Sequence, residues 1–257
     1  MPAAPSTADS QGSSPPKYRS FLFPIIAFEL LVVGLTMARA IVREKSPMRY
    51  FGEAGIISWL SFLQLLVLAA LSLWIFLVRK RGAPVKWTAP QSLWQWMAIG
   101  FFFLAVDEIA QIHEMVDSGF HSLFQIQENR LTDSIDDLIV LLYGIAGGYI
   151  LYLFRQEFKR YRPAFKLVTY AFISAAIMVV FDVFTNIDPE SNIDAFKVFF
   201  SDLESRHALL VWLQATEEVF KILAEGFFIA AFAICLQIAR RLNRSTSMDT
   251  RVDANPE

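Results

Sequence analysis

The sequence is dominated by apolar blocks of about 20 residues, each long enough to cross the hydrocarbon core of a bilayer as an α-helix. Hydrophobic residues make up 55% of the chain, more than a soluble domain usually carries. An isolated strand cannot satisfy its backbone hydrogen bonds in lipid, so each block is predicted to be helical. The expected fold class is therefore an all-α, polytopic bundle of transmembrane helices with six spans. The spans are predicted at 20–42, 55–79, 93–116, 134–156, 164–185 and 208–240.

Composition divides the chain into three regions. Residues 1–18 are expected to form a disordered cytoplasmic arm, residues 19–241 the transmembrane domain, and residues 242–257 a disordered cytoplasmic tail. In the last outer loop, apolar residues recur at helical spacing over 193–206, which predicts a short helix on the membrane surface. The single cysteine, Cys235, excludes an internal disulfide framework.

The distribution of basic residues predicts the orientation. They precede the first span and follow the second, fourth and sixth, so the positive-inside rule places both termini in the cytoplasm of a bacterial inner membrane protein. The first loop departs from the rule, because it carries Arg43, Lys45 and Arg49 on the outer side. Cleavage of the first span as a signal peptide, at the Ala-x-Ala sequence 38–40, is an alternative. The length of the apolar stretch and the presence of Glu29 favour an uncleaved span.

Ionisable and polar residues inside the spans fall on narrow helical faces. Positions i, i+4 and i+7 of a helix share a face, and the polar residues repeat at this spacing. The residues concerned are Asp107, Gln111 and Glu114 in the third span, Asp136 in the fourth, and Gln214, Glu218, Lys221 and Glu225 in the sixth. Glu29 in the first span and Gln64 in the second add single polar positions. We expect the spans to turn these polar edges toward a common interior.

The expected depth of the acids points to a polar cavity that opens to the outside. Glu29, Asp107 and Glu225 fall near mid-membrane, and the cytoplasmic halves of the spans carry few charges. A charge at the middle of a span costs about 2.5–3.5 kcal/mol. Lys221 and His113 cannot neutralise all the acids, so we expect protons or a bound cation to offset the remaining charge.

A divalent metal ion is the most specific form of this hypothesis. Carboxylates with a minority of imidazole suit hard or borderline cations. The expected metal ligands are Asp107, His113, Glu114, Asp136, Glu218 and Glu225. The expected catalytic groups, which would support the ligands or carry protons, are Glu108, Glu217 and Asp182. With three histidines, the chain cannot hold the histidine-box centre of membrane desaturases and hydroxylases.

Structural explanations remain open for the same residues. A third span that ends early would leave His113 and Glu114 at the membrane interface. Lys221 could pair with Glu217 or Glu225 along the sixth span and form a self-neutralised stripe, since these residues lie four positions from it.

Three functions from different classes fit the sequence. In the first, the cation site supports metal-dependent chemistry on a lipid-borne or membrane-soluble substrate. In the second, the same carboxylates serve a proton- or cation-coupled transporter. In the third, the chain is a scaffold subunit that pairs with another membrane protein or with a second copy of itself. Membrane lipid is an expected neighbour in all three, and nucleic acid is not an expected partner.

Overall fold

The computed structural model describes residues 19–52, 55–80, 82, 84–112, 115–116, 119, 135–186 and 203–252. Every regular element in this part of the chain is a helix, which confirms the all-α prediction. The helices are α1 (Arg19–Val42), α2 (Met48–Phe51), α3 (Ile56–Lys80), α4 (Ser92–Ala110), α6 (Ile135–Leu153), α7 (Arg155–Phe158), the 3-10 helix η1 (Lys159–Ala164), α8 (Phe165–Asn186) and α10 (Leu203–Val252). The predicted arm, residues 1–18, lies outside the described residues.

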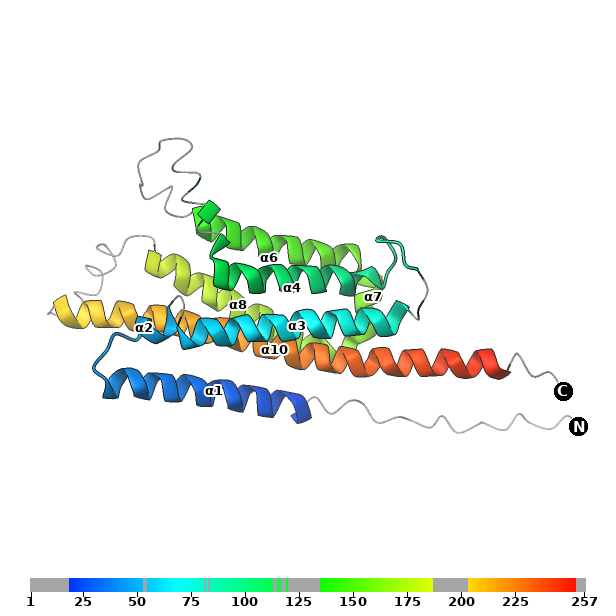
Figure 1. The fold of residues 1–257 in the computed structure, drawn as a ribbon, viewed down its shortest axis with the longest axis horizontal. Helices are drawn as coiled ribbons and strands as arrows, with labels where there is room; N and C mark the ends of the chain where they lie inside the picture. The colour runs from blue at the N-terminus through cyan, green and yellow to red at the C-terminus, as the bar shows by residue number, and fades with distance from the viewer. Residues whose placement is uncertain are drawn as a thin grey trace, which may run out of the picture.

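The long helices lie side by side, and successive ones run in opposite directions (Figure 1). α10 contacts α1, α3 and α8, whereas α4 packs on α3 and α6 packs on α4. The start of α1 and the end of α10 lie at the same end of the bundle (Figure 1). α10 therefore forms the centre of the fold, and any side chain on its inner face meets residues from several other helices.

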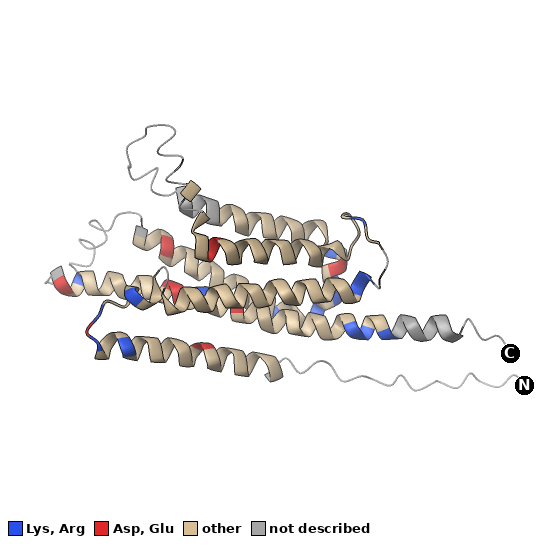
Figure 2. Ribbon diagram, in the orientation of Figure 1, with Lys and Arg blue, Asp and Glu red and all other residues tan. Residues whose placement is uncertain are grey.

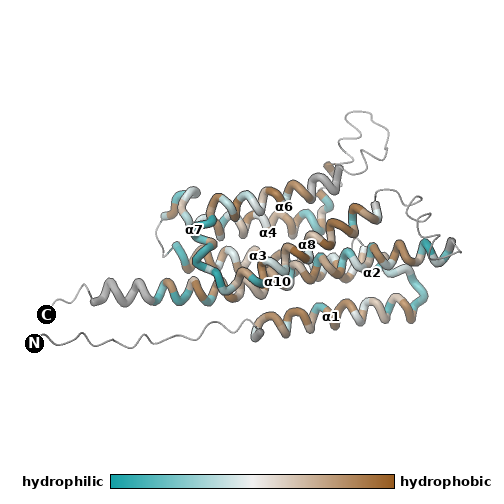
Figure 3. Tube along the Cα trace, turned by 180° about the vertical axis from the view of Figure 1, so that it is seen from behind, coloured by the Kyte–Doolittle hydropathy of each residue, from teal (hydrophilic) through white to brown (hydrophobic). Residues whose placement is uncertain are grey.

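Five of the helical segments are long and apolar enough to cross a membrane, and α6 includes a shorter apolar stretch. Figure 3 shows apolar helix shafts with hydrophilic segments near several helix ends. Large apolar side chains are exposed along these shafts, among them Phe23 at 77% and Val180 at 67%. Exposed apolar surface of this extent requires a non-aqueous neighbour, as expected for a multi-pass membrane protein. The chain is therefore embedded in a membrane.

The sequence placed the limits of three long helices closely but misplaced the end of a fourth. The first, second and fifth predicted spans differ from α1, α3 and α8 by at most one residue at each end. The third was expected to continue to residue 116, but α4 ends at Ala110. Gln111 adopts a left-handed conformation with φ 51°, and its N–H donates to the carbonyl of Asp107 at 2.7 Å. A left-handed residue in this position ends a helix, so α4 is shorter than the third predicted span.

The last helix is longer than the sixth predicted span. α10 begins at Leu203 and continues to Val252, past the expected end at residue 240 and into the expected tail. The part of α10 that is long and apolar enough to span a membrane is Glu204–Arg244. The surface helix predicted for 193–206 falls mostly outside the described residues, so that expectation stays a prediction.

A buried ionic junction joins α3 to the turn between α6 and α8. The Glu157 side chain is fully buried and accepts hydrogen bonds from Arg79, at 2.7 and 3.1 Å, and from the Tyr161 hydroxyl at 3.2 Å. Arg160 lies 3.3 Å from the same carboxylate. The Tyr161 ring packs edge-on against Trp94 at 5.0 Å, and Trp94 packs in the same way on Phe232. Aromatic packing thus encloses an ion pair whose polar atoms are well satisfied.

Candidate functional site

Lys221 of α10 joins two carboxylates from different helices. Its Nζ atom donates to Glu108 Oε1 of α4 at 3.0 Å and lies 2.7 Å from Glu218 Oε2, one turn earlier on α10. The side chains of all three residues are mostly buried, with 16–22% exposed. Glu108 reaches this position because it lies in the last turn of α4, just before the helix ends. The cross-helix contact therefore fixes the end of α4 against the middle of α10.

Glu225 lies one turn deeper on the same face of α10. Its Oε1 atom accepts a hydrogen bond from the Ser61 hydroxyl of α3 at 2.7 Å, and its side chain is 7% exposed. Glu218, Lys221 and Glu225 make these contacts from one face of α10, as expected for three of the four residues of the polar edge predicted for the last span. The edge faces α3 and α4 and not lipid.

Glu29 of α1 extends the polar contacts to a fourth helix. Its carboxylate is fully buried and accepts a hydrogen bond from the side-chain amide of Gln64 on α3. Gly226 of α10 lies against the same carboxylate, so closely that a Cβ atom added there would overlap it. The Glu29 side chain thus fills the space that a side chain on residue 226 would need. We call Glu29, Ser61, Gln64, Glu108, Glu218, Lys221 and Glu225 the polar network.

The close approach of Gly226 to Glu29 leads to a testable prediction. Gly226→Ala should destabilise the protein by about 1–3 kcal/mol, the usual cost of overpacking, although alanine favours helix more than glycine does. Thermal unfolding in detergent measures the change. Gly34→Ala on α1 is the matched control, since nothing lies within 4 Å of its added Cβ, and it should not destabilise.

A double-mutant cycle isolates the cause of that loss. Glu29→Ala removes the carboxylate that the new methyl group would meet, so Gly226→Ala should cost much less in the Glu29→Ala background than in the wild type. An equal cost in both backgrounds would contradict the assigned contact.

The polar network contains more acids than bases. Its four glutamates face one lysine, and Lys221 makes its described contacts with Glu108 and Glu218. In Glu29 and Glu225, Oε1 accepts a hydrogen bond, whereas Oε2 is buried and has no hydrogen-bond partner within the described part of the chain. A carboxyl group in this setting can take up a proton or bind a cation through its second oxygen.

The other predicted site residues are distributed around the polar network. Asp107 is 5% exposed and adjoins Glu108 on α4. Glu217 is half-buried beside Glu218 on α10, and Asp182 is half-buried on α8. Phe181, next to Asp182, stacks on Phe220 of α10 at 5.9 Å. The proposed roles of Asp107, Glu217 and Asp182 stay predictions.

The remaining expected ligands cannot be placed. His113 and Glu114 lie outside the described residues, and Asp136 lies in α6 at a position where the backbone alone is described. Within the described ranges, no group of three or more acidic, histidine or cysteine side chains is arranged to hold a metal ion. Lys221 places its ammonium group between Glu108 and Glu218, where a shared metal ion would otherwise lie. The metal site stays a prediction, because His113, Glu114 and the side chain of Asp136 are not described.

Two residues that the sequence interpretation missed complete the site. Ser61 lies one turn before Gln64, so the spacing of small and polar residues on α3 would have indicated it. Gly226 carries no such signal, because its role depends on Glu29 of a distant helix. Figure 2 shows the wider charge pattern, with basic residues gathered at the end of α3, in the last described part of α10 and around α2, and acidic residues both within helices and at some helix ends.

Comparison with known proteins identifies the family of the chain but does not indicate an activity. No curated protein and no solved structure matches the chain. One family model, described as a domain of unknown function (DUF8692), matches residues 25–236. This match runs from α1 to α10 and includes every residue of the polar network. The chain is therefore a member of the DUF8692 family.

Proposed function

We propose that the polar network binds and releases a proton as the coupling step of cation-coupled transport across the membrane. The observation that supports this function is the pair of buried acids, Glu29 and Glu225, each with one carboxyl oxygen bonded and the other unpartnered in the described structure. Ionisable residues inside membrane spans are costly and commonly lie on ion or proton pathways. Lys221 supplies a positive charge one turn from Glu225 on α10.

A proton fits this site better than a divalent metal for two reasons. Lys221 already neutralises charge on Glu108 and Glu218, and a dication beside its ammonium group would be repelled. Glu29 accepts a hydrogen bond from Gln64 and Glu225 accepts one from Ser61, so each carboxyl group has one oxygen left, which is a small ligand set for a metal. A single carboxyl group is sufficient to carry a proton.

The proposed orientation has both termini in the cytoplasm of a bacterial inner membrane. It is supported by the basic residues of α3 and α10 that lie at the same end of the bundle as the start of α1 (Figure 2). In this orientation Glu108 and Lys221 lie toward the outer side, and Glu29 and Glu225 lie deeper. A proton that entered from outside would therefore reach Glu108, Glu218 and Lys221 before it reached Glu29 and Glu225.

Infrared spectroscopy of the purified protein tests the proton directly. Protonated carboxylic acids have a C=O stretching band that carboxylates lack, and we expect such a band to change with pH in the wild type. Glu29→Gln and Glu225→Gln should each remove part of it. Glu204→Gln is the control, because Glu204 is exposed at the start of α10. An unchanged band in both buried variants would contradict the proposal.

Flux measurements test the transport step separately. Proteoliposomes with a trapped pH-sensitive dye should show proton movement down an imposed gradient, and Glu225→Gln should abolish it while Glu204→Gln should not. Elemental analysis of the same preparation tests the alternative. Near-stoichiometric metal that is lost in Asp107→Asn, without proton flux in the wild type, would favour metal-dependent chemistry.

A further inference from the structure

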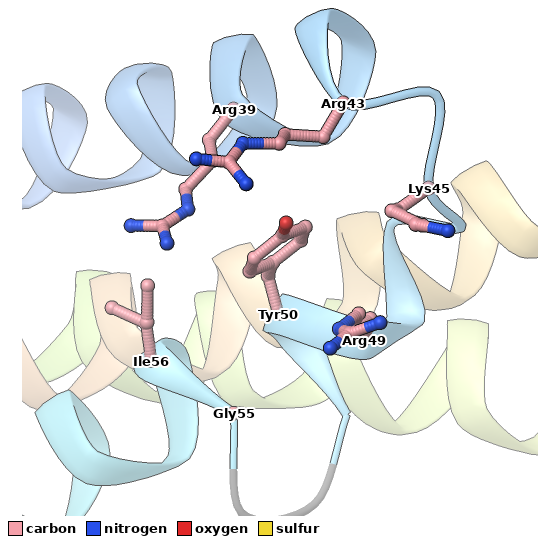
Figure 4. Close-up of a pocket in the computed structure, with 7 residues that line it drawn as sticks. All are labelled: Arg39, Arg43, Lys45, Arg49, Tyr50, Gly55 and Ile56. Atoms are coloured by element: carbon pink, nitrogen blue, oxygen red, sulfur yellow. The ribbon is translucent and has the colours of Figure 1, made fainter.

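A basic pocket lies between the end of α1, the short helix α2 and the start of α3. It has a volume of about 370 Å³. The basic side chains that line it are Arg39, Arg43, Lys45 and Arg49, and Tyr50, Gly55 and Ile56 complete the wall. Figure 4 shows Arg39, near the end of α1, and Arg43, in the turn that follows, on the side of the pocket that Tyr50 faces.

The four basic residues lack acidic partners in the described structure. Among the described residues, none of the four forms an ion pair, and the guanidinium of Arg39 instead lies over the Tyr50 ring at 5.7 Å. Glu44 belongs to the same turn and is exposed, but it does not line the pocket. Like charges that converge on one pocket repel each other, so an anion bound between them would stabilise the arrangement.

The chemistry of the pocket favours a phosphate group. A guanidinium group presents a planar fork of N–H donors that matches phosphate oxygens, and such charge-assisted hydrogen bonds are among the strongest in proteins. Three of the four basic residues are arginines, and the Tyr50 hydroxyl adds one more donor. Tyr50 is half-buried, so it offers a fixed wall to the bound group.

The residues around the pocket indicate that it lies near lipid headgroups. Large apolar side chains next to it are exposed, with Val42 at 81%, Ile41 at 65% and Trp59 at 51%. Exposed aliphatic residues with a tryptophan at a helix end are typical of the boundary between lipid chains and headgroups. The pocket also contains the basic residues of the first loop, which depart from the positive-inside rule. A binding role would explain their presence on the outer side.

We propose that this pocket binds a phosphate group, as carried by the headgroup of an anionic phospholipid or by free phosphate. The geometry that supports it is one cavity lined by four cations from α1, α2 and the turn between them. This inference is independent of the proton-binding function, because none of its residues belongs to the polar network.

Native mass spectrometry of the full chain in a neutral detergent tests the proposal. Phosphatidylglycerol, phosphatidylcholine and inorganic phosphate are titrated separately. We expect phosphatidylglycerol to bind more tightly than phosphatidylcholine. Arg43→Gln/Arg49→Gln should weaken that binding about tenfold or more, since it removes two charge-assisted contacts. Both residues are exposed, so this variant should fold normally.

Arg162→Gln/Lys166→Gln is the matched control. It also removes two exposed positive charges, at the other end of the bundle, and should leave lipid binding unchanged. If inorganic phosphate displaces the lipid at equal concentration, the ligand of the pocket is free phosphate. If inorganic phosphate does not displace the lipid, the ligand is the lipid headgroup. Equal affinity for the two lipids together with no binding of inorganic phosphate, or equal loss in the pocket and control variants, would overturn the proposal.

Discussion

Lys221→Met is expected to destabilise the protein by about 3–5 kcal/mol, the usual result of removing one partner of a buried ion pair. The substitution leaves Glu108 and Glu218 close together without the ammonium group that now lies 3.0 and 2.7 Å from them. Methionine fills much of the same volume as lysine. The decrease in the free energy of unfolding is therefore caused by the lost charge and not by a cavity. Thermal or denaturant unfolding in detergent measures it.

A compensated variant separates stability from function. Lys221→Met/Glu108→Gln/Glu218→Gln replaces all three charged groups by neutral ones and should recover most of the lost stability. If Lys221 is part of the proton pathway, the variant should still fail to move protons in liposomes. Lys166→Met, at an exposed position on α8, is the control and should behave as the wild type does. A stable, uncompensated Lys221→Met protein would show that the bridge contributes little.

Glu157→Gln is expected to produce a loss of similar size, about 3–5 kcal/mol, at the other end of the bundle. Glu157 is fully buried and receives two hydrogen bonds from Arg79 and one from Tyr161. A neutral amide leaves the Arg79 guanidinium, which is 11% exposed, without its counter-charge. Unfolding measurements should show the loss, and Glu204→Gln provides a control at an exposed glutamate.

Replacing the whole pair should be much less harmful than breaking it. Arg79→Met/Glu157→Leu removes both charges together, and apolar replacements of buried ion pairs are often neutral or stabilising. Near wild-type stability in the double variant, with a large loss in Glu157→Gln, would identify charge burial as the cause. A double variant as unstable as the single one would indicate that the junction depends on hydrogen-bond geometry instead. Proton flux should be retained in the double variant, since the junction lies apart from the polar network.

The sequence alone determined the membrane spans and the polar faces. Hydropathy over a window of about 20 residues is a local property, and it located α1, α3 and α8 to within one residue. The face shared by Glu218, Lys221 and Glu225 also followed from the sequence, because helical rotation is fixed by backbone geometry. The sequence therefore predicts that these three charged side chains face the interior of the helix bundle, although it does not identify their partners.

The tertiary structure alone decided which groups meet. Lys221 contacts Glu108 because α4 ends at Ala110 and packs near α10, whereas the sequence offered Glu217 and Glu225 as equally good partners. The contact of Gly226 with Glu29, and that of Arg79 with Glu157, join residues far apart in the chain. Such pairings depend on how helices pack, and no periodicity within one helix encodes its neighbour. For this reason the sequence could place acids in the membrane but could not show that a lysine already occupies the position between two of them.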